Sequence, residues 1–425
     1  MTQKREIGAD IIVVGGGAAG MMAAGQAAGQ GARVVLLEKK KRTGLKIGIS
    51  GKGRCNLTNS ADLDAFLGHF GKNGRFLRQA FHQFFAPELM AFFNDLGLPL
   101  VTERGGRVFP ASGRALDVVN ALRSWLNRQD VRLIRTSPVT RLLIRNDAIR
   151  GVACADRTLL ADRVILATGG ASYPATGSSG DGYRLARQVG HAIVPVRPAL
   201  VPLETDAELV AELRGLHLRN TRVLLRANGK TVASHFGELC FYEHGISGPV
   251  ILTLSLAAVD ALRAGDRVEI LLDLKPALDE KQLDARLCRD LERRCHEPMQ
   301  DVLRGLLPRE LVPLCLRRTD IRPDQQAGQL RKKARKKLGR WLKNWPIAIT
   351  GHRGFDEAIV TAGGVALGEI DPRTMASRLC PGLSIAGELL DLAGDTGGYN
   401  LQAAFSTGWL AGRAAAKSVQ QECRP

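Results

Sequence analysis

Short, mainly apolar runs separated by a small-residue segment lie near the start of the chain. Asp10–Val14 is followed at once by glycine, Ala18–Gly29 is rich in alanine and glycine, and Arg33–Leu37 is apolar again. Apolar runs of this length are typical of strands buried on both faces, and the segment between them has the length of a helix. The pattern predicts a βαβ unit with a parallel pair of strands.

Two further runs of the same kind, Asp162–Ala167 and Leu383–Ala386, also end in glycine, and they lie far apart along the chain. We therefore expect one α/β domain built from both ends of the sequence. Between about Pro195 and Trp345 the pattern changes to amphipathic strands and then to polar helical segments. The interpretation is an insertion that divides the first domain in two.

The turn after the first predicted strand reads Gly15-Gly16-Gly17-Ala18-Ala19-Gly20, which matches G-x-G-x-x-G between a strand and a helix. In this context Gly15 permits the tight turn, Gly17 lets a pyrophosphate approach the backbone, and Gly20 allows close helix–strand packing. Glu38 ends the second strand 18 residues beyond Gly20, where a carboxylate accepts hydrogen bonds from a ribose. A carboxylate there disfavours a 2′-phosphate, so the sequence predicts a nucleotide of the FAD or NAD kind.

Near the carboxyl end, Gly397-Gly398-Tyr399-Asn400 opens a helix of small residues. The exposed N–H groups of such a helix start would suit the flavin edge that becomes negative on reduction. A purely structural helix start explains the same residues equally well. From the residues alone, both interpretations stay open.

Six motifs in order give the chain a resemblance to the RdsA/BaiN-like family of FAD-dependent flavoproteins. Besides GGGAAG with Glu38, they are KIGISGKGRCNLTN (46–59), ATGGASYPATGSSGDGYRLARQVGH (167–191), ELCFYEHGISGPVIL (238–252), TGHRGFDEAIVTAGGVALGEIDPRTMASRL (350–379) and GELLDLAGDTGGYNLQAAFSTGWLAG (387–412). The resemblance implies an α/β fold: a discontinuous Rossmann-type FAD-binding domain (1–194 and 346–425), an inserted β-rich, barrel-like subdomain (195–275) and a helical basic subdomain (276–345). The chain departs from the family at Lys52, where the family loop usually has glycine.

The resemblance also implies which residues contact FAD. The expected set is Gly15, Gly17, Ala18, Ala19, Gly20, Glu38, Lys39, Ser50, Gly51, Gly53, Gly169, Gly387, Glu388, Asp391, Gly397, Gly398, Tyr399, Asn400, Leu401 and Gln402. In the family, the loop from Ser50 to Asn59 lies beside the isoalloxazine ring.

Four residues are candidates for catalysis. Arg54 and Asn56 would orient a substrate carbonyl, and Cys55 would supply a proton after hydride delivery, although a lone cysteine is more often a small buried apolar residue. His244 lies in a glycine-flanked turn and would act as an acid or as a substrate hydrogen-bond partner, although a hydrogen-bonded turn histidine is the commoner case. The remaining histidines and the eight cysteines have no metal-binding spacing, so no metal site is expected.

The balance of 60 lysines and arginines against 42 acidic residues gives a net charge of +18, which favours a polyanionic partner. Residues 331–345, RKKARKKLGRWLKNW, carry much of the excess. Its cations are distributed around a helix rather than along one stripe, and they are candidates for RNA phosphate contacts: Arg331, Lys332, Lys333, Arg335, Lys336, Lys337, Arg340 and Lys343. A solvated cationic helix is the alternative. Trp341 and Trp345 would either stack on bases or dock the helix onto its own domain.

These observations predict an NAD(P)H- and FAD-dependent oxidoreductase that reduces a conjugated C=C bond. The family resemblance and the charge favour a uridine of 23S ribosomal RNA, reduced to dihydrouridine, with RNA as partner. A steroid-type alkene is the first alternative, and a flavin-containing RNA-binding protein without turnover is the second. No second dinucleotide motif is evident, so NADPH or NADH would visit the flavin transiently. Neither a signal peptide nor an apolar run of about 18 residues is evident, so we expect a cytoplasmic protein without a membrane partner.

Overall fold

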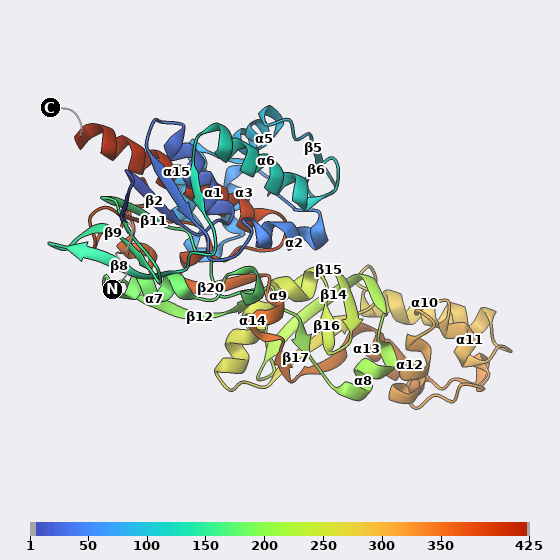
Figure 1. Ribbon diagram of the computed structural model, residues 1–425. Coiled ribbons are helices and arrows are strands. Elements are labelled where there is room, and N and C mark those ends of the chain that lie inside the picture. The colour runs from blue at the N-terminus through green and yellow to red at the C-terminus, as the bar shows by residue number, and fades with distance from the viewer. Residues whose placement is uncertain (1–5, 423–425) are drawn as a thin grey trace. The chain divides into compact units, whose positions relative to one another are not determined.

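The computed structural model describes residues 6–422 of the chain, which forms two compact units (Figure 1). Unit 1 contains the residues up to Ala199 and those from Phe355 on, and unit 2 is Leu200–Gly354. The division falls at 199/200 and 354/355, whereas the sequence suggested 194/195 and 345/346. The first boundary lies later because β12 (Ile193–Ala199) pairs with β20 (Val360–Val365) of unit 1. The second lies later because β18 (Trp345–Ile349) and β19 (Gly351–His352) pair with strands of the insertion.

A five-stranded parallel sheet forms the centre of unit 1, in the order β21-β11-β2-β3-β7. Its strands are β2 (Ile11–Val14), β3 (Val34–Leu37), β7 (Arg132–Ile134), β11 (Arg163–Leu166) and β21 (Leu383–Ile385). β2 and β3 are buried along their whole length, as fully apolar strands covered on both faces must be. The predicted parallel sheet built from both ends of the chain is therefore confirmed.

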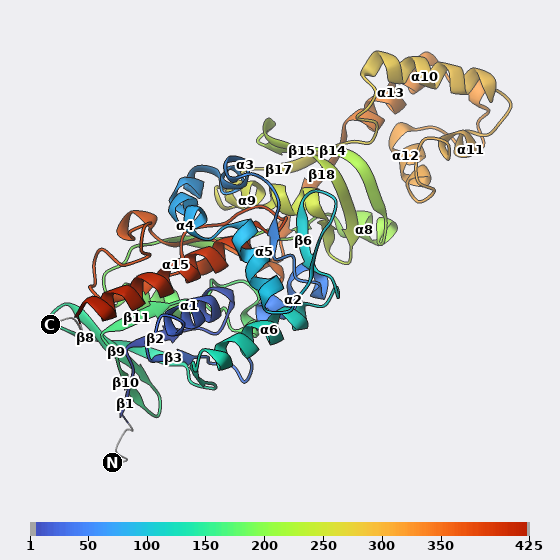
Figure 2. The ribbon, with the colours of Figure 1, turned by 90° about the horizontal axis from the view of Figure 1, so that it is seen from above.

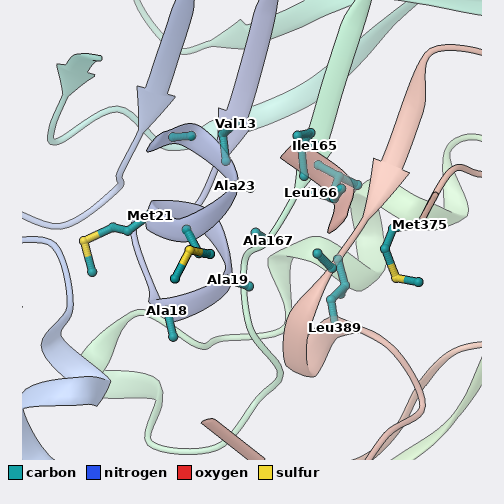
Figure 3. Close-up of a cluster of buried hydrophobic side chains, with 14 of the residues drawn as sticks. Val13, Ala18, Ala19, Met21, Ala23, Ile165, Leu166, Ala167, Met375 and Leu389 are labelled. Atoms are coloured by element: carbon teal, nitrogen blue, oxygen red, sulfur yellow. The ribbon is translucent and has the colours of Figure 1, made fainter. Parts of the chain in front are cut away.

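Two helices rich in small residues, α1 (Ala18–Ala28) and α15 (Tyr399–Glu422), lie side by side in unit 1 (Figure 2). Their backbones approach so closely that a Cβ on Gly408 would lie 2.2 Å from the carbonyl oxygen of Ala19, and one on Gly412 2.3 Å from that of Ala23. The start of α1, the end of β11 and Leu389 share one buried cluster (Figure 3). The glycine-rich turn before α1 is thus set on a rigid base.

The other elements of unit 1 surround this centre. They are β1 (Glu6–Gly8), α2 (Leu45–Gly53), β4 (Thr58–Asn59), α3 (Leu63–Gly68), η1 (Gly71–Leu77), α4 (Arg78–Gln83), α5 (Ala86–Asp95), β5 (Leu100–Thr102), β6 (Arg107–Pro110), α6 (Ala115–Arg128), β8 (Val139–Arg145), β9 (Ala148–Cys154), β10 (Thr158–Leu160), η2 (Pro174–Thr176), α7 (Asp181–Arg187), β12 (Ile193–Ala199), α14 (Gly354–Glu357, whose first residue belongs to unit 2), β20 (Val360–Val365), η4 (Leu367–Glu369) and η5 (Gly387–Leu389).

Unit 2 contains a seven-stranded antiparallel sheet in the order β18-β17-β14-β15-β16-β13-β19. The two edge strands, β18 and β19, are separated by the single residue Thr350, so the sheet must curl until its edges meet. This is the barrel-like arrangement that the resemblance implied. The other strands are β13 (Leu203–Glu204), β14 (His217–Ala227), β15 (Lys230–Tyr242), β16 (Gly245–Ser247) and β17 (Val268–Asp273).

The helices of unit 2 share one hydrophobic core with this sheet, which is why the β-rich and helical pieces form one unit. They are α8 (Ala207–Leu213), α9 (Pro249–Arg263), α10 (Glu280–Arg293), α11 (Met299–Leu303), α12 (Leu311–Thr319), η3 (Ala327–Gln329) and α13 (Lys332–Lys343). No helix among residues 6–422 is long and apolar enough to cross a membrane.

Candidate functional site

The turn between β2 and α1 has the form of a pyrophosphate cradle. Gly15 has a φ of +108°, and a Cβ there would lie 2.4 Å from the carbonyl oxygen of Ala167. A Cβ on Gly20 would lie 1.7 Å from the carbonyl oxygen of Gly15, so only glycine closes this turn. A Cβ on Gly17, in contrast, would meet nothing within 4 Å. The backbone at Gly17 therefore faces open space, as a bound phosphate requires.

The N-terminus of α1 can bind an anion. Its N-cap is Gly17, no side chain caps it, and its first turn holds no acidic residue. The free N–H groups and the helix dipole therefore favour an anion at this end. Ala18 and Ala19 are 9% and 6% exposed, and their side chains have no polar atom, so these two residues can offer a bound phosphate only backbone N–H groups.

Glu38 is fixed at the end of β3 by the backbone. Its Oε2 accepts from the N–H of Gly16 at 2.8 Å, and its Oε1 accepts from the N–H of Lys40 at 2.7 Å. Each carboxylate oxygen keeps a second lone pair, so the group can still accept from ribose hydroxyls. The neighbouring Lys39 instead forms an ion pair with Asp181 at 2.5 Å, which occupies its ammonium group.

The segment predicted as active-site wall has an unusual backbone. Within the range of α2 the chain leaves helical geometry at Ser50, and Gly51 and Lys52 are left-handed, with φ of 57° and 58°. Gly53 and Cys55 are left-handed too, at 82° and 61°. Left-handed residues other than glycine are costly and cluster at functional sites, so the conformation makes this loop a candidate site.

Cys55 itself is an unfavourable proton donor. Its side chain is fully buried within the core of unit 1, and this burial raises the pKa of the thiol to about 12. A donor must reach the substrate, and this thiol has no exposed surface. The structure therefore supports the alternative, a small buried apolar residue.

Arg54 and Asn56 differ in how much of their polar groups is free. The guanidinium of Arg54 donates to Glu103 at 2.5 Å and lies 4.2 Å from the centre of the Phe109 ring, and the Glu103 hydrogen bond raises the pKa of Arg54. The buried Oδ1 of Asn56 accepts no hydrogen bond within the described residues. A buried oxygen without a donor is costly, so Asn56 is the better candidate for contacting a ligand.

A partly buried ionic cluster that the sequence did not reveal lies in the same unit. Lys46 donates to Glu388 Oε2 at 2.7 Å and to Ser172 Oγ at 2.8 Å. Glu388 Oε1 accepts from Ser172 Oγ at 2.8 Å and from the N–H of Thr361 at 2.9 Å. These four residues come from four different family motifs, but no spacing rule joins positions 342 residues apart. The cluster ties the loop after β11 to η5.

The glycines that flank this cluster are demanded by close packing. A Cβ on Gly169, whose φ is +73°, would lie 2.7 Å from Ser178 Oγ, and one on Gly387, with φ of +75°, would lie 2.8 Å from the Cβ of Ala19. Both are therefore required by the fold whether or not they also touch FAD.

Asparagine side chains fix the segment before α15. Asn59 donates to the carbonyl of Gly397 at 3.1 Å, and Asn73 donates to the carbonyl of Asp391 at 2.8 Å. Asn400 accepts from the N–H of Gly394 at 2.8 Å. Gly398 has a φ of +103°, and a Cβ there would lie 2.3 Å from the carbonyl of Thr58. The helix start therefore has a single, fixed orientation.

The residues after Gly398 divide between surface and core. Leu401 is half-buried against the core, and Tyr399 is 6% exposed. Gln402 is 0% exposed and donates to Ser406 at 2.9 Å, so its side chain is turned into the core. The buried Oε1 of Gln402 accepts no hydrogen bond within the described residues, and the expected contact of Gln402 with FAD stays a prediction.

His244 belongs to unit 2. It lies in the turn between β15 and β16 and is exposed, and its ring lies 6.3 Å from that of Tyr242, centre to centre. Within the described part of the chain, its ring has no hydrogen bond or ion pair. Its role as an acid stays a prediction.

Helix α13 carries two kinds of cation. Arg335 donates to both oxygens of Asp284 at 2.9 and 3.2 Å, and Lys343 donates to Asp273 at 2.6 Å. Lys337 forms an ion pair with Asp320. Three of the eight expected phosphate contacts are therefore engaged in ion pairs within unit 2.

The other five cations are exposed and have no ion pair within the described residues. We call them the free α13 cations: Arg331, Lys332, Lys333, Lys336 and Arg340. The pKa of Asp284 is lowered first by its hydrogen bond with Arg335 and then by the charges of Arg335, Lys336 and Lys332. Because both oxygens of Asp284 accept from Arg335, this carboxylate forms no ion pair with the free α13 cations.

The two tryptophans are core residues. Trp341 and Trp345 are 8% and 3% exposed and stack at 5.2 Å between ring centres, and Trp345 also stacks on Phe241 at 5.9 Å. Trp345 belongs to β18, not to the helix. They dock α13 onto the sheet, so stacking on RNA bases is excluded for this conformation.

The cradle at Gly15–Gly20, the open space at Gly17, the uncapped start of α1 and the carboxylate of Glu38 together fit the pyrophosphate and ribose of FAD. The fold and this site define an FAD-dependent oxidoreductase with a Rossmann-type domain. The family model of the HI0933-like protein Rossmann domain matches residues 9–414, and the chain belongs to this family.

Curated relatives cover nearly the whole chain. It is 38% identical over 387 residues to the 3-dehydro-bile acid delta(4,6)-reductase of Clostridium scindens. The matched region covers 91% of this chain and 93% of the relative. It is 31% identical over 401 residues to the ribosomal RNA dihydrouridine synthase of Escherichia coli, covering 94% and 96%. Among solved structures, a 3-ketosteroid delta1-dehydrogenase from Sterolibacterium denitrificans shares the fold, with a TM-score of 0.53 at 14% identity over 97% of this chain and 100% of that one.

Proposed function

We propose that this flavoprotein reduces a conjugated C=C bond, that its substrate is a uridine of large-subunit (23S) ribosomal RNA, and that NADPH or NADH reduces the flavin. The observation that carries the RNA assignment is the set of free α13 cations, which are exposed and have no ion pair within unit 2 as described. A small apolar substrate gives no reason for such a set, whereas RNA phosphates do. The name of the relative from Escherichia coli supports the same substrate class.

The residues of the site have distinct tasks in this reaction. When bound, FAD would supply the hydride. The N-terminus of α1 would hold its pyrophosphate, and Glu38 would hold its ribose. The fixed start of α15 would offer N–H groups to a developing negative charge. The unpaired Oδ1 of Asn56 and the left-handed loop around it form the wall against which the substrate is oriented.

A small-molecule alkene is the second candidate, because the Clostridium scindens relative, at 38% identity, is named as a bile acid reductase. Both reactions add hydrogen across a C=C bond conjugated to a carbonyl group. They differ in the substrate: RNA phosphates would bind the free α13 cations, whereas a small apolar alkene would not need them.

Nucleoside mass spectrometry of ribosomal RNA tests the two candidates. Dihydrouridine should fall when the gene is deleted and return with the intact gene. Purified protein should reduce uridine in 23S RNA from the deletion strain in the presence of NADPH or NADH. Unchanged dihydrouridine, together with turnover of a 3-keto-4-ene steroid by the purified protein, would overturn the RNA assignment.

A salt titration of RNA binding tests directly whether the free α13 cations bind RNA phosphates. The triple variant Lys332→Gln, Lys336→Gln, Arg340→Gln should lower the slope of log K against log salt by about 2 to 3, since each lost phosphate contact removes about 0.7–0.9. The matched control replaces three exposed arginines of unit 1, Arg123, Arg128 and Arg145, with glutamine. An equal loss in both variants would show that net charge, not α13, binds RNA.

A further inference from the structure

An aspartate–histidine pair lies in unit 1 beside the start of α15. The Nδ1 of His69, at the end of α3, lies 2.8 Å from Oδ2 of Asp395, although the two residues are 326 positions apart. The N–H of Asp395 also donates to the carbonyl oxygen of His69 at 3.2 Å. Two hydrogen bonds of different kinds therefore fix the ring against this loop.

Tyr399 fixes the plane of the same imidazole. The two rings stack with centres 3.9 Å apart and an interplanar angle of 24°. Tyr399 in turn packs edge-on against the fully buried Phe66, with ring centres 4.7 Å apart. Burial, and then the charge of Asp395, raise the pKa of the Tyr399 phenol, so this ring stays neutral beneath the histidine.

The second nitrogen of His69 is free. Both His69 and Asp395 have side chains that are 36% exposed, and only Nδ1 has a hydrogen-bond partner within the described residues. A histidine held through Nδ1 by a carboxylate and presenting Nε2 has the arrangement of an oriented acid or base. A histidine that served packing alone would be buried or would use both nitrogens, as His191 does with Glu369 and Ser377.

The place of this pair in the fold connects it to the flavin site. Asp395 is two residues from Gly397, whose carbonyl oxygen is held by Asn59 at 3.1 Å, and Gly398 is packed on the carbonyl of Thr58. The candidate active-site wall at 50–59 and the segment carrying Asp395 therefore meet at the start of α15. Through these contacts His69 extends this wall with an imidazole ring.

We propose that His69 is the proton donor for alkene reduction and that Asp395 and Tyr399 are its positioning residues. This inference rests on the proposed function, which needs an acid, and Cys55 is too deeply buried to be one. Hydride addition to one carbon of the double bond, with oxidation of the flavin, leaves the former π pair on the substrate as an enolate. The proton on Nε2 forms the second C–H bond, the imidazole is left neutral, and solvent returns the proton.

Stopped-flow measurement of the two half-reactions tests this assignment. His69→Ala should slow reoxidation of the reduced holoenzyme by substrate about a hundredfold or more, as is usual for loss of a general acid. Flavin reduction by NADPH or NADH should be unchanged, and added imidazole should restore part of the lost rate. Asp395→Asn should give an intermediate loss. The matched control His82→Ala removes an exposed histidine of α4 and should change neither half-reaction.

A labelling experiment gives a readout independent of turnover. In the oxidised holoenzyme, diethyl pyrocarbonate should modify His69 at Nε2, and saturating product should protect it, whereas His82 should be modified equally in both states. Absent protection, or reoxidation by substrate at the wild-type rate in His69→Ala, would overturn the inference while leaving the proposed function intact. Failure of the wild-type protein to reduce either RNA or a steroid alkene would overturn the proposed function itself.

Discussion

Replacing Lys52 with glycine should stabilise the protein, which is the reverse of the usual effect of glycine substitution. Lys52 has a φ of 58° and a ψ of 41°, inside the left-handed region, and its side chain is exposed. The structure records no hydrogen bond or ion pair for it within the described residues, so little is lost with the side chain. Gly51 and Gly53 on either side are left-handed too, at 57° and 82°.

The magnitude follows from two opposing contributions. A residue with a Cβ in the left-handed region costs about 1–2 kcal/mol, which glycine does not incur. Glycine loses more conformational entropy on folding, which costs about 0.5–1 kcal/mol. The net expectation is a gain of about 0.5–1 kcal/mol in the free energy of unfolding. For a unit of this size that corresponds to a rise in Tm of about 2–4 °C per kcal/mol.

Urea unfolding of the holoenzyme, followed by flavin fluorescence so that unit 1 is observed, measures this change. Lys52→Ala keeps the left-handed strain and should stay close to the wild type. Lys417→Gly, on the exposed side of α15, should lose about 0.5–1 kcal/mol. The reasoning is refuted if Lys52→Gly destabilises unit 1 or if Lys52→Ala stabilises it equally. Equal weakening of FAD binding in both Lys52 variants would indicate that the charge itself contacts the cofactor.

Three further predictions concern packing and titration. Gly408→Val should separate α1 from α15, because a Cβ would lie 2.2 Å from the Ala19 carbonyl oxygen, and it should lower the free energy of unfolding by about 1–3 kcal/mol in calorimetry or urea titration. Cys55, with a thiol pKa raised to about 12 by burial, should resist iodoacetamide at pH 8 in the native state and react once urea unfolds the chain. Arg335 lowers the pKa of Asp284, so the stability that Asp284→Asn removes should be present at neutral pH and vanish as the pH falls below about 4.

The cofactor half of the site could be predicted from sequence because its requirements are local. A turn that must admit a pyrophosphate needs glycine at fixed intervals between a strand and a helix, so Gly15, Gly17 and Gly20 are recognisable without coordinates. Glu38 follows from the length of one helix and one strand. The sheet built from both ends of the chain was also accessible, because β2, β11 and β21 are short and mainly apolar and glycine follows each of them within three residues.

The polar clusters of unit 1 were not accessible in the same way. Lys46 meets Glu388 across 342 positions and His69 meets Asp395 across 326, and neither pair has a motif spacing. Their formation depends on the tertiary packing of α2, α3 and the segment before α15. Histidine at position 69 therefore had no distinguishing feature in the sequence, whereas Cys55, inside a conspicuous motif, is a buried core residue.

The cationic helix shows how a charge count misleads about function. Eight cations in residues 331–345 suggested a surface that is positive on most sides. Three of them are neutralised by Asp284, Asp320 and Asp273, which lie 51, 17 and 70 positions earlier in the chain and which no inspection of the run itself would include. The two tryptophans are likewise buried in the core of unit 2, where they stack on each other, so they are not available to bind RNA bases. Within residues 331–345, the RNA proposal therefore depends on the five free α13 cations, and phosphate affinity should respond to those positions and not to Arg335 or Lys343.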